Sequence, residues 1–155
     1  MSASRGGGPG DARGPLEYPA ELLARIARLC EEDLERERCG LVIRDGGSLR
    51  AVLIANAAAA RDAFLLDARE QLRLEKRLRE RGGEVVAVWH SHLDAPATLS
   101  RRDREGAMVD GREALPGAEQ LVVGLRAGRA VELRRWRFRD GRFEEVALPA
   151  LRPDP

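Results

Sequence analysis

The chain has 155 residues, which suits one domain with a sizeable core and leaves no room for a second. Its 27 basic and 26 acidic residues nearly cancel, so no long-range field points to nucleic acid or a membrane. Two cysteines cannot form a disulfide framework, and no apolar stretch reaches the ~18 residues of a membrane span. We therefore expect a cytoplasmic domain without a membrane or nucleic-acid partner.

The N-terminal region divides into a predicted tail and a predicted helix. Residues 1–15 are rich in Gly, Ser and Pro, which predicts a flexible tail before a single domain over residues 16–150. After Pro19, apolar residues up to Leu34 have helical spacing, which predicts a helix that ends near residues 35–38.

Two strands and a second helix should follow. Residues 39–43 and 49–55 are predicted to form a hairpin around Gly46-Gly47. The expected helix over residues 68–80 stops at Gly82-Gly83, which suits a left-handed C-cap. The two cysteines, one on the apolar face of the first helix and one opening the first strand, should be buried and reduced. They are Cys30 and Cys39.

The second half of the chain is predicted to be mostly strand. Residues 84–92 are almost continuously apolar and indicate a central strand, and a short helix should follow Ser100. Strands are expected over residues 121–125 and 131–138 across Gly128, with Asp140-Gly141 turning into a strand over residues 143–148. Apolar alternation slips between Leu133 and Trp136, which would fit a bulge. The pattern predicts an α/β layer fold with a mixed or mainly antiparallel sheet and helices packed on it.

The most informative residues are His90 and His92, the only histidines in the chain. At positions i and i+2 of a strand they point to the same face, so both imidazoles can reach one metal ion. Either histidine alone would more often be a structural residue that caps a core strand. Together with a carboxylate at the next helix, Asp103, they favour a zinc site with an open fourth position.

Ser100 and Asp103 have two interpretations. Ser-x-x-Asp ahead of a helix resembles a capping box, which needs no metal. The two roles are compatible, because Ser100 can be the N-cap while Asp103 turns its carboxylate to the metal.

His90-Ser91-His92, seven residues, Ser100, two residues and Asp103 together resemble the JAMM motif of the MPN-fold metalloproteases. That motif is a glutamate followed by H-[ST]-H-x7-S-x2-D. In its small bacterial members, such as the Mec-like peptidases that process sulfur-carrier proteins, the glutamate precedes a Cys-Gly that opens a strand. Glu37-Arg38-Cys39-Gly40 is similar.

The resemblance covers about residues 19–148 and includes Asn56 and the segment 64–67. It implies the MPN fold. Many bacterial relatives carry proline directly after the second histidine, whereas this chain has Leu93, with Pro96 three residues later. This departure concerns the rigidity of the loop and touches no ligand.

The resemblance also implies roles for the site residues. Zinc would be held by His90, His92 and Asp103, with Glu37 as general base and acid. Ser100 would donate a hydrogen bond to the oxyanion. Ser91 points to the opposite strand face and is expected to support the site structurally. Without the resemblance, Glu37 could not be distinguished from the neighbouring glutamates, which are Glu31, Glu32 and Glu35.

The implied function is zinc-dependent hydrolysis of a peptide or isopeptide at the Gly-Gly tail of a ubiquitin-like or sulfur-carrier protein. Two alternatives stay open. One is an MPN scaffold without catalysis, which the complete ligand set disfavours. The other is a zinc amidohydrolase acting on a small molecule. The His-x-Glu and Pro-Cys-x-x-Cys elements of nucleobase deaminases are absent from the sequence, which counts against that branch.

Overall fold

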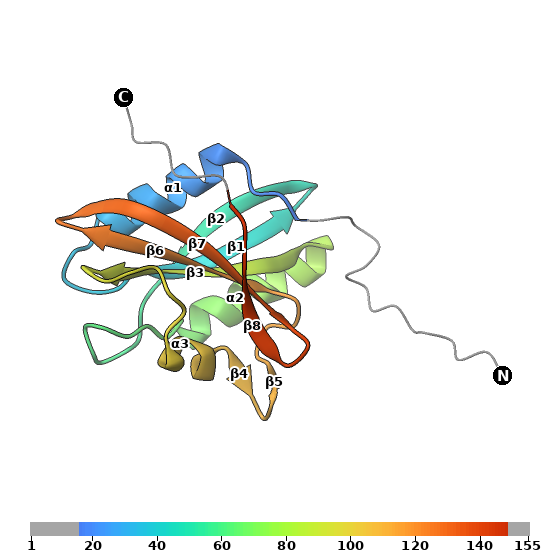
Figure 1. Ribbon diagram of the computed structural model, residues 1–155. Helices are drawn as coiled ribbons and strands as arrows, with labels where there is room; N and C mark the ends of the chain where they lie inside the picture. The colour runs from blue at the N-terminus through green and yellow to red at the C-terminus, as the bar shows by residue number, and fades with distance from the viewer. Residues whose placement is uncertain (1–15, 149–155) are drawn as a thin grey trace.

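The computed structural model describes residues 16–148. The expected tail over residues 1–15 and the last two residues of the expected domain, 149–150, lie outside the described residues. Three helices and eight strands form this region, ordered as in Figure 1. They are α1 (Ala20–Glu31), β1 (Cys39–Asp45), β2 (Ser48–Ile54), α2 (Ala68–Arg81), β3 (Glu84–Leu93), α3 (Arg101–Gly106), β4 (Met108–Val109), β5 (Arg112–Glu113), β6 (Glu119–Arg126), β7 (Arg129–Arg139) and β8 (Arg142–Val146).

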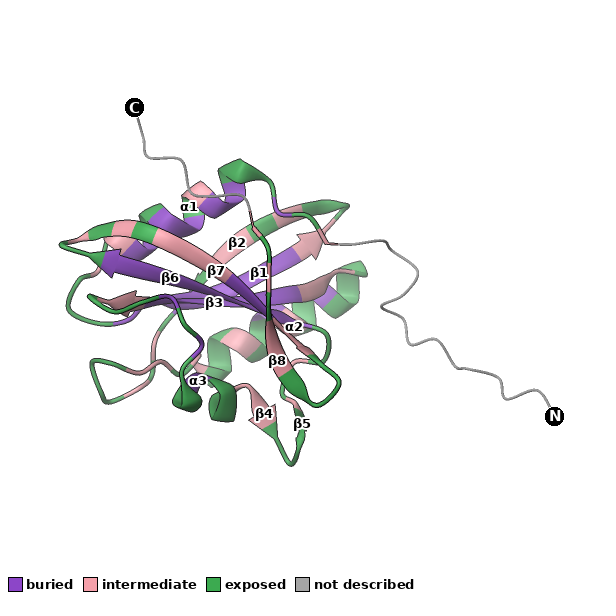
Figure 2. Ribbon diagram, in the orientation of Figure 1, coloured by how far each residue is buried: buried purple, intermediate pink, exposed green. Residues whose placement is uncertain are grey.

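A six-stranded sheet in the order β2-β1-β3-β6-β7-β8 organises the molecule. The pair β3 and β6 is parallel and every other pair is antiparallel, so the expected mixed sheet is confirmed. Helix α1 covers one face, and α2 and α3 lie on the other (Figure 1). The central strands β1, β3 and β6 are the most deeply buried, as the purple ribbon in Figure 2 shows. Because β3 lies inside the sheet, its ends are fixed by neighbours on both sides.

Alternation along β3 assigns its side chains to the two faces. Trp89 packs with the α1 core, which includes Leu23 and Ile26. Val88 packs instead with Leu74 and other residues of the α2 side. The even-numbered side chains that follow Val88, at positions 90 and 92, therefore point to the α2 and α3 face. We call this the site face.

Helix α1 is shorter than the sequence pattern predicts, because it ends at Glu31. The Asp33 carboxylate accepts hydrogen bonds from the backbone N–H groups of Glu35 and Arg36 at 3.0 and 3.2 Å, which holds a turn in place of further helix. Leu34 is consequently 46% exposed, so its expected place on the buried helix face is wrong. The early stop leaves residues 32–38 as an irregular connection that leads to Glu37 and β1.

The bulge predicted between Leu133 and Trp136 is also wrong. Pairing of β7 with β6 is continuous through these residues, and the register shift lies beside Gly124, where Ala130 and Glu132 flank the extra residue. The apparent slip arises because both sheet faces are covered. Leu133 packs against the α1 side, whereas Trp136 is buried on the site face.

The predicted turns are confirmed by positive φ angles. Gly46 and Gly47 have φ of 61° and 84°, and Gly82 caps α2 with φ of 72°. Asp140 and Gly141, with φ of 52° and 80°, join β7 to β8. The short hairpin of β4 and β5 was not expected from the sequence. Among the described residues, no helix has the length and apolar character needed to traverse a bilayer.

Candidate functional site

Two histidine nitrogens and one carboxylate oxygen converge at the C-terminal end of β3. The Nε2 atoms of His90 and His92 are 3.1 Å apart. Oδ2 of Asp103 is 3.2 Å from the first nitrogen and 3.1 Å from the second. Ligands about 2.0–2.1 Å from a tetrahedral zinc ion are separated by roughly 3.3–3.4 Å, so this triangle has nearly the right size for one ion. The donor set of two imidazoles and a carboxylate fits zinc.

Each imidazole is held by a different contact. Nδ1 of His92 is 2.7 Å from the carbonyl oxygen of Pro96, so this nitrogen carries the proton and Nε2 is left free to bind a metal. The ring of His90 stacks on Phe64 with centroids 4.2 Å apart. Nδ1 of His90 is buried without a hydrogen-bond partner among the described residues. Packing therefore orients His90, whereas a hydrogen bond orients His92.

The start of α3 positions Asp103. Ser100 is the N-cap, and its Oγ accepts a hydrogen bond from the Asp103 N–H at 3.1 Å. Oδ2 of Asp103 accepts one from the Ser100 N–H at 3.0 Å, which completes a capping box. The same oxygen faces both histidines. The two interpretations of this segment therefore coexist, and the cap fixes the carboxylate that a metal would bind.

Glu37 lies on the other side of the histidines and is only 3% exposed. Its carboxylate oxygen and the ligand nitrogens of His90 and His92 lie within 4.8 Å of one another. Asn56 Nδ2 donates to the Glu37 carbonyl oxygen at 2.8 Å. Ser91 Oγ accepts a hydrogen bond from the backbone N–H of Arg38 at 2.8 Å. Both contacts fix the backbone beside Glu37. The Ser91 side chain lies on the strand face opposite to His90 and His92, as expected.

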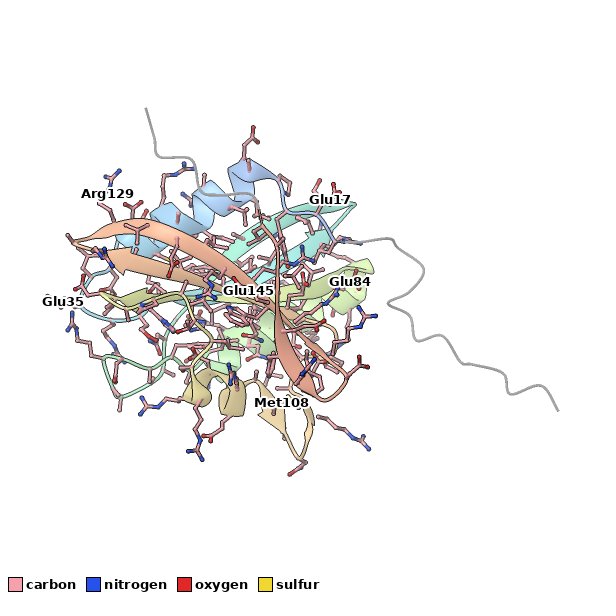
Figure 3. All side chains as sticks on the ribbon, viewed as in Figure 1. Glu17, Glu35, Glu84, Met108, Arg129 and Glu145 are labelled. Carbon is pink, nitrogen blue, oxygen red and sulfur yellow. The ribbon has the colours of Figure 1, made fainter. Side chains whose placement is uncertain are left out.

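The neighbouring glutamates lie elsewhere. Glu31 pairs with Arg129 at 3.2 Å, and Glu32 pairs with Arg38 at 3.0 Å. Glu35 is exposed and lies at the periphery of the molecule (Figure 3). Glu37 is the glutamate of this segment that the structure brings to the histidines.

Burial and mutual charge shift the pKa values of the site. Burial raises the pKa of Glu37 to about 7, and nearby His92 partly opposes that shift. Burial would raise the pKa of Asp103 too, but hydrogen bonds from both histidines outweigh it and hold the pKa well below its usual value. Burial lowers the pKa of His90. For His92, burial acts in the same direction, but Asp103 and the Pro96 carbonyl outweigh it and raise the pKa.

The segment 56–66 supports the site in a way that sequence reasoning did not specify. Asn56 uses its whole amide: it donates to the carbonyls of Glu37 and Ala63 and accepts from the N–H groups of Ala58 and Leu65. These bonds shape the loop that delivers Phe64 to the His90 ring. The asparagine was visible in the sequence, but three of its four partners lie seven or more residues away.

The loop after His92 is anchored without a proline at position 93. The Asp94 carboxylate accepts from the Ala127 N–H at 3.0 Å. Glu132 accepts from the Ala97 N–H at 2.6 Å, and Trp136 Nε1 donates to the Ala97 carbonyl at 3.3 Å. The loop also crosses Gly124, where a Cβ atom would meet the backbone at 3.1 Å. Contacts with β6 and β7 therefore keep the Pro96 carbonyl at the histidine.

The Cys-Gly pair after Glu37 has a steric basis. A Cβ on Gly40 would lie 2.0 Å from the Val52 carbonyl oxygen and 2.5 Å from the Trp89 ring. Only glycine lets the indole lie across β1, where its Nε1 donates to the Leu41 carbonyl at 3.2 Å. The glycine thus allows β1 and β3 to pair next to the site.

A family model described as prokaryotic homologs of the JAB domain matches residues 19–139. The chain belongs to this family. The matched range contains Glu37, His90, His92, Ser100 and Asp103. The MPN fold expected from the sequence is thereby confirmed.

Curated relatives named CysO-cysteine peptidase occur in Mycobacterium bovis and Mycobacterium tuberculosis. Each is 28% identical over 133 residues, covering 84% of this chain and 87% of the relative. Two solution structures are also similar. A Desulfitobacterium hafniense protein has a TM-score of 0.64 at 24% identity, covering 81% of this chain and 86% of its own. A Salinibacter ruber protein has a TM-score of 0.54 at 26% identity, covering 89% and 91%.

Proposed function

We propose that this protein is a zinc-dependent peptidase that cleaves at the C-terminal Gly-Gly tail of a ubiquitin-like or sulfur-carrier protein. The observation that carries the proposal is the triangle of His90, His92 and Asp103, with ligand atoms 3.1–3.2 Å apart and Glu37 beside it. Membership of the JAB-domain family and the name of the mycobacterial relatives, CysO-cysteine peptidase, support the substrate class.

Zinc would be held by His90, His92 and Asp103, and would supply Lewis acidity that polarises the scissile carbonyl and makes a water molecule more acidic. Glu37 accepts the proton of the attacking water and delivers it to the leaving amine. A carboxyl with a pKa of about 7 suits both directions of this transfer. The Glu37 carboxyl is held in one place because the residue is buried and because Asn56 anchors its backbone carbonyl.

Ser100 would bind the developing oxyanion. Its Oγ accepts the Asp103 N–H, and accepting that bond leaves the hydroxyl proton free for another acceptor. The side chain is exposed at the edge of the site, where a substrate carbonyl can reach it. Ser91 and Asn56 act through the backbone around Glu37.

The test compares two adducts of one carrier protein with the zinc-loaded enzyme. One ends in the native diglycine followed by an attached amino acid, and the other has Val-Val in place of the diglycine. Mass spectrometry before and after incubation should show release of the amino acid from the diglycine adduct alone. Equal cleavage of both adducts, or cleavage of neither while a generic peptide is hydrolysed, would favour the small-molecule amidase instead.

A further inference from the structure

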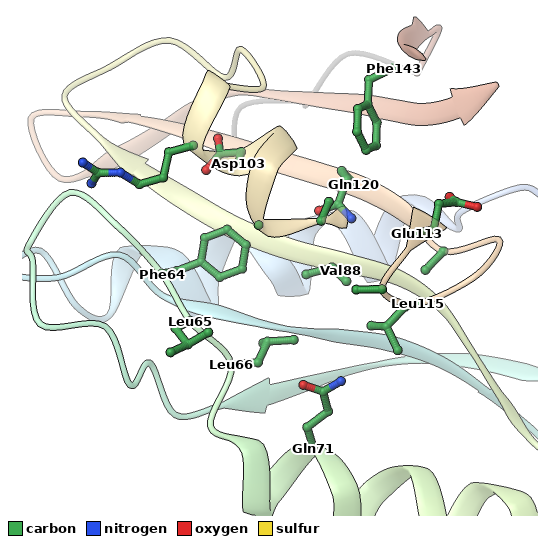
Figure 4. A pocket seen from close by; sticks show the side chains of 15 residues that line it. Phe64, Leu65, Leu66, Gln71, Val88, Asp103, Glu113, Leu115, Gln120 and Phe143 are labelled. Atoms are coloured by element: carbon green, nitrogen blue, oxygen red, sulfur yellow. The ribbon is translucent and has the colours of Figure 1, made fainter. Parts of the chain in front are cut away.

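A small apolar pocket lies directly beside the candidate metal site. Its volume is about 150 Å³, and its lining includes the metal-side residue Asp103 and the side chain that stacks on His90, Phe64. Figure 4 shows Phe64, Val88 and Leu115 around one space, with Asp103 on the side of α3. A cavity of this size lined by apolar groups can hold a benzene ring. The pocket therefore has room for one large apolar side chain.

One deeply buried polar side chain in this lining has no hydrogen-bond partner among the described residues. Gln120, on β6 beside Val88, is only 6% exposed. Its amide has no hydrogen-bond partner among residues 16–148, although its atoms are not sealed from the pocket space. Burying an amide without a partner is costly, so a donor and an acceptor are held ready for a ligand. Mostly apolar walls with a few polar groups are typical of a specificity pocket.

A second hollow lies on the Glu37 side. It measures about 440 Å³ and is lined by polar residues, such as Arg36 and Asn56, and by the end of β2. The two hollows thus differ in size and polarity on the two sides of the histidines. The larger polar one suits an extended main chain, whereas the smaller apolar one suits a single side chain.

We propose that the apolar pocket binds the residue released by cleavage, and that this residue has a large apolar side chain. The inference rests on the proposed function. The two glycines before the scissile bond have no side chain, so the residue after that bond is the nearest one that can fill a pocket beside Asp103. Water oxygen bonds to the final glycine carbonyl carbon, the amide C–N bond breaks, and the water proton passes through Glu37 to the released amine. Gln120 donates from its NH₂ to the carboxylate of the released residue.

The first experiment varies the released residue. The zinc-loaded full chain is incubated with carrier-tail peptides that end in Gly-Gly-X, where X is Phe, Leu, Cys, Ala or Asp. We expect kcat/KM for Phe and Leu to exceed that for Ala by about 10- to 100-fold, the size expected when one large apolar side chain is buried. The Glu37→Gln variant, which should cut the peptide about 10²–10⁴-fold more slowly, allows the same ranking to be measured as binding affinity.

The second experiment fills the pocket with a larger side chain or removes its Gln120 amide. Leu115→Trp should lower kcat/KM for the Phe peptide to nearly the value for the Ala peptide. Gln120→Leu should weaken binding of every Gly-Gly-X peptide by about 10-fold, since one hydrogen bond to a charged group is lost. Leu72→Trp is the matched control, because Leu72 is 64% exposed on α2 and outside the pocket lining. Bound zinc reports that each variant is folded.

The outcomes separate the two proposals. Preference for Phe and Leu that Leu115→Trp removes and Leu72→Trp keeps would support the pocket assignment. Equal rates for all five peptides would overturn it while leaving the proposed peptidase activity intact. If zinc is bound and no Gly-Gly-X peptide is cut, the proposed function itself fails, and the pocket assignment fails with it.

Discussion

The two faces of the central sheet treat polar groups in opposite ways, and adjacent residues of β6 show the difference. Glu119, on the α1 face, accepts from Tyr18 at 2.7 Å and from Arg135 at 2.9 Å. Burial raises the pKa of Tyr18 well above its usual value, and the Glu119 charge adds to the shift. Gln120, on the site face, has no partner within the described part of the chain. The α1 face satisfies this buried carboxylate, whereas the site face leaves the Gln120 amide available.

The same contrast holds for packing. The α1 face is a continuous apolar core around Ile26 and Trp89, neither of which is exposed. The site face is divided into two smaller clusters, with the histidines and the apolar pocket between the covering elements. Stability should therefore depend mainly on the α1 face, and activity on the other. The following substitutions test this division.

The largest effect is expected for His92→Ala. Removing an outer contact of a metal-bound histidine typically costs up to ~100-fold in metal affinity, so losing the ligand itself should cost more than about 100-fold. Zinc content by mass spectrometry should fall from one ion per chain to nearly none, and cleavage should cease. Full zinc occupancy in this variant would show that the ion lies elsewhere.

Glu37→Gln should keep zinc and lose activity by about 10²–10⁴-fold, because the amide cannot carry the proton. Its matched control is Glu35→Gln, two residues away and exposed. Steady-state kinetics with zinc-loaded protein measure both. Strong loss in the Glu35 variant together with normal activity in the Glu37 variant would contradict the assigned base.

Ile26→Ala tests the opposite face. Truncating a side chain with no exposed surface should lower the free energy of unfolding by about 2–5 kcal/mol, measured by urea denaturation. Zinc stoichiometry and kcat of the folded fraction should stay unchanged. A selective loss of kcat in folded protein would mean that the two faces are coupled more tightly than their separate cores indicate.

Glu132→Ala should have a smaller effect that reaches the site through the loop after His92. The Ala97 N–H loses its acceptor, and the Pro96 carbonyl that orients His92 is held less firmly. We expect zinc affinity to fall by up to about 10-fold, at the lower end for a residue behind a ligand. Glu132→Gln, which still offers an acceptor oxygen, should restore it in a competition assay with a chelator.

The smallest effect concerns the two thiols. Burial raises the pKa of Cys39 to about 12 and raises that of Cys30 further, so neither should react quickly in the native state. Cys30 lies in the α1 core, whereas Cys39 opens β1 at the site. A thiol reagent should therefore label Cys39 first, with single alanine variants assigning the two phases. Faster labelling of Cys30 would contradict the expectation that the α1 face is the more stable of the two faces.

Much of the fold follows from local patterns. The apolar run of β3 predicts a central strand, and glycines at the turns predict where strands reverse. The bulge and the end of α1 could not be read in this way. Burial on both sides of β7 imitates a slipped register, and the Asp33 side chain stops the helix where apolar spacing continues.

For the site, the sequence by itself determined the spacing. Two histidines at i and i+2 share a strand face, and a capping serine fixes a carboxylate three residues later, because both relations depend only on local backbone geometry. The tertiary structure decided the rest. It selected Glu37 among four glutamates, brought Asn56 and Phe64 to the site, and left Gln120 facing a pocket. These contacts join distant segments, and only the packing of the sheet and its covering elements fixes the distances between such segments.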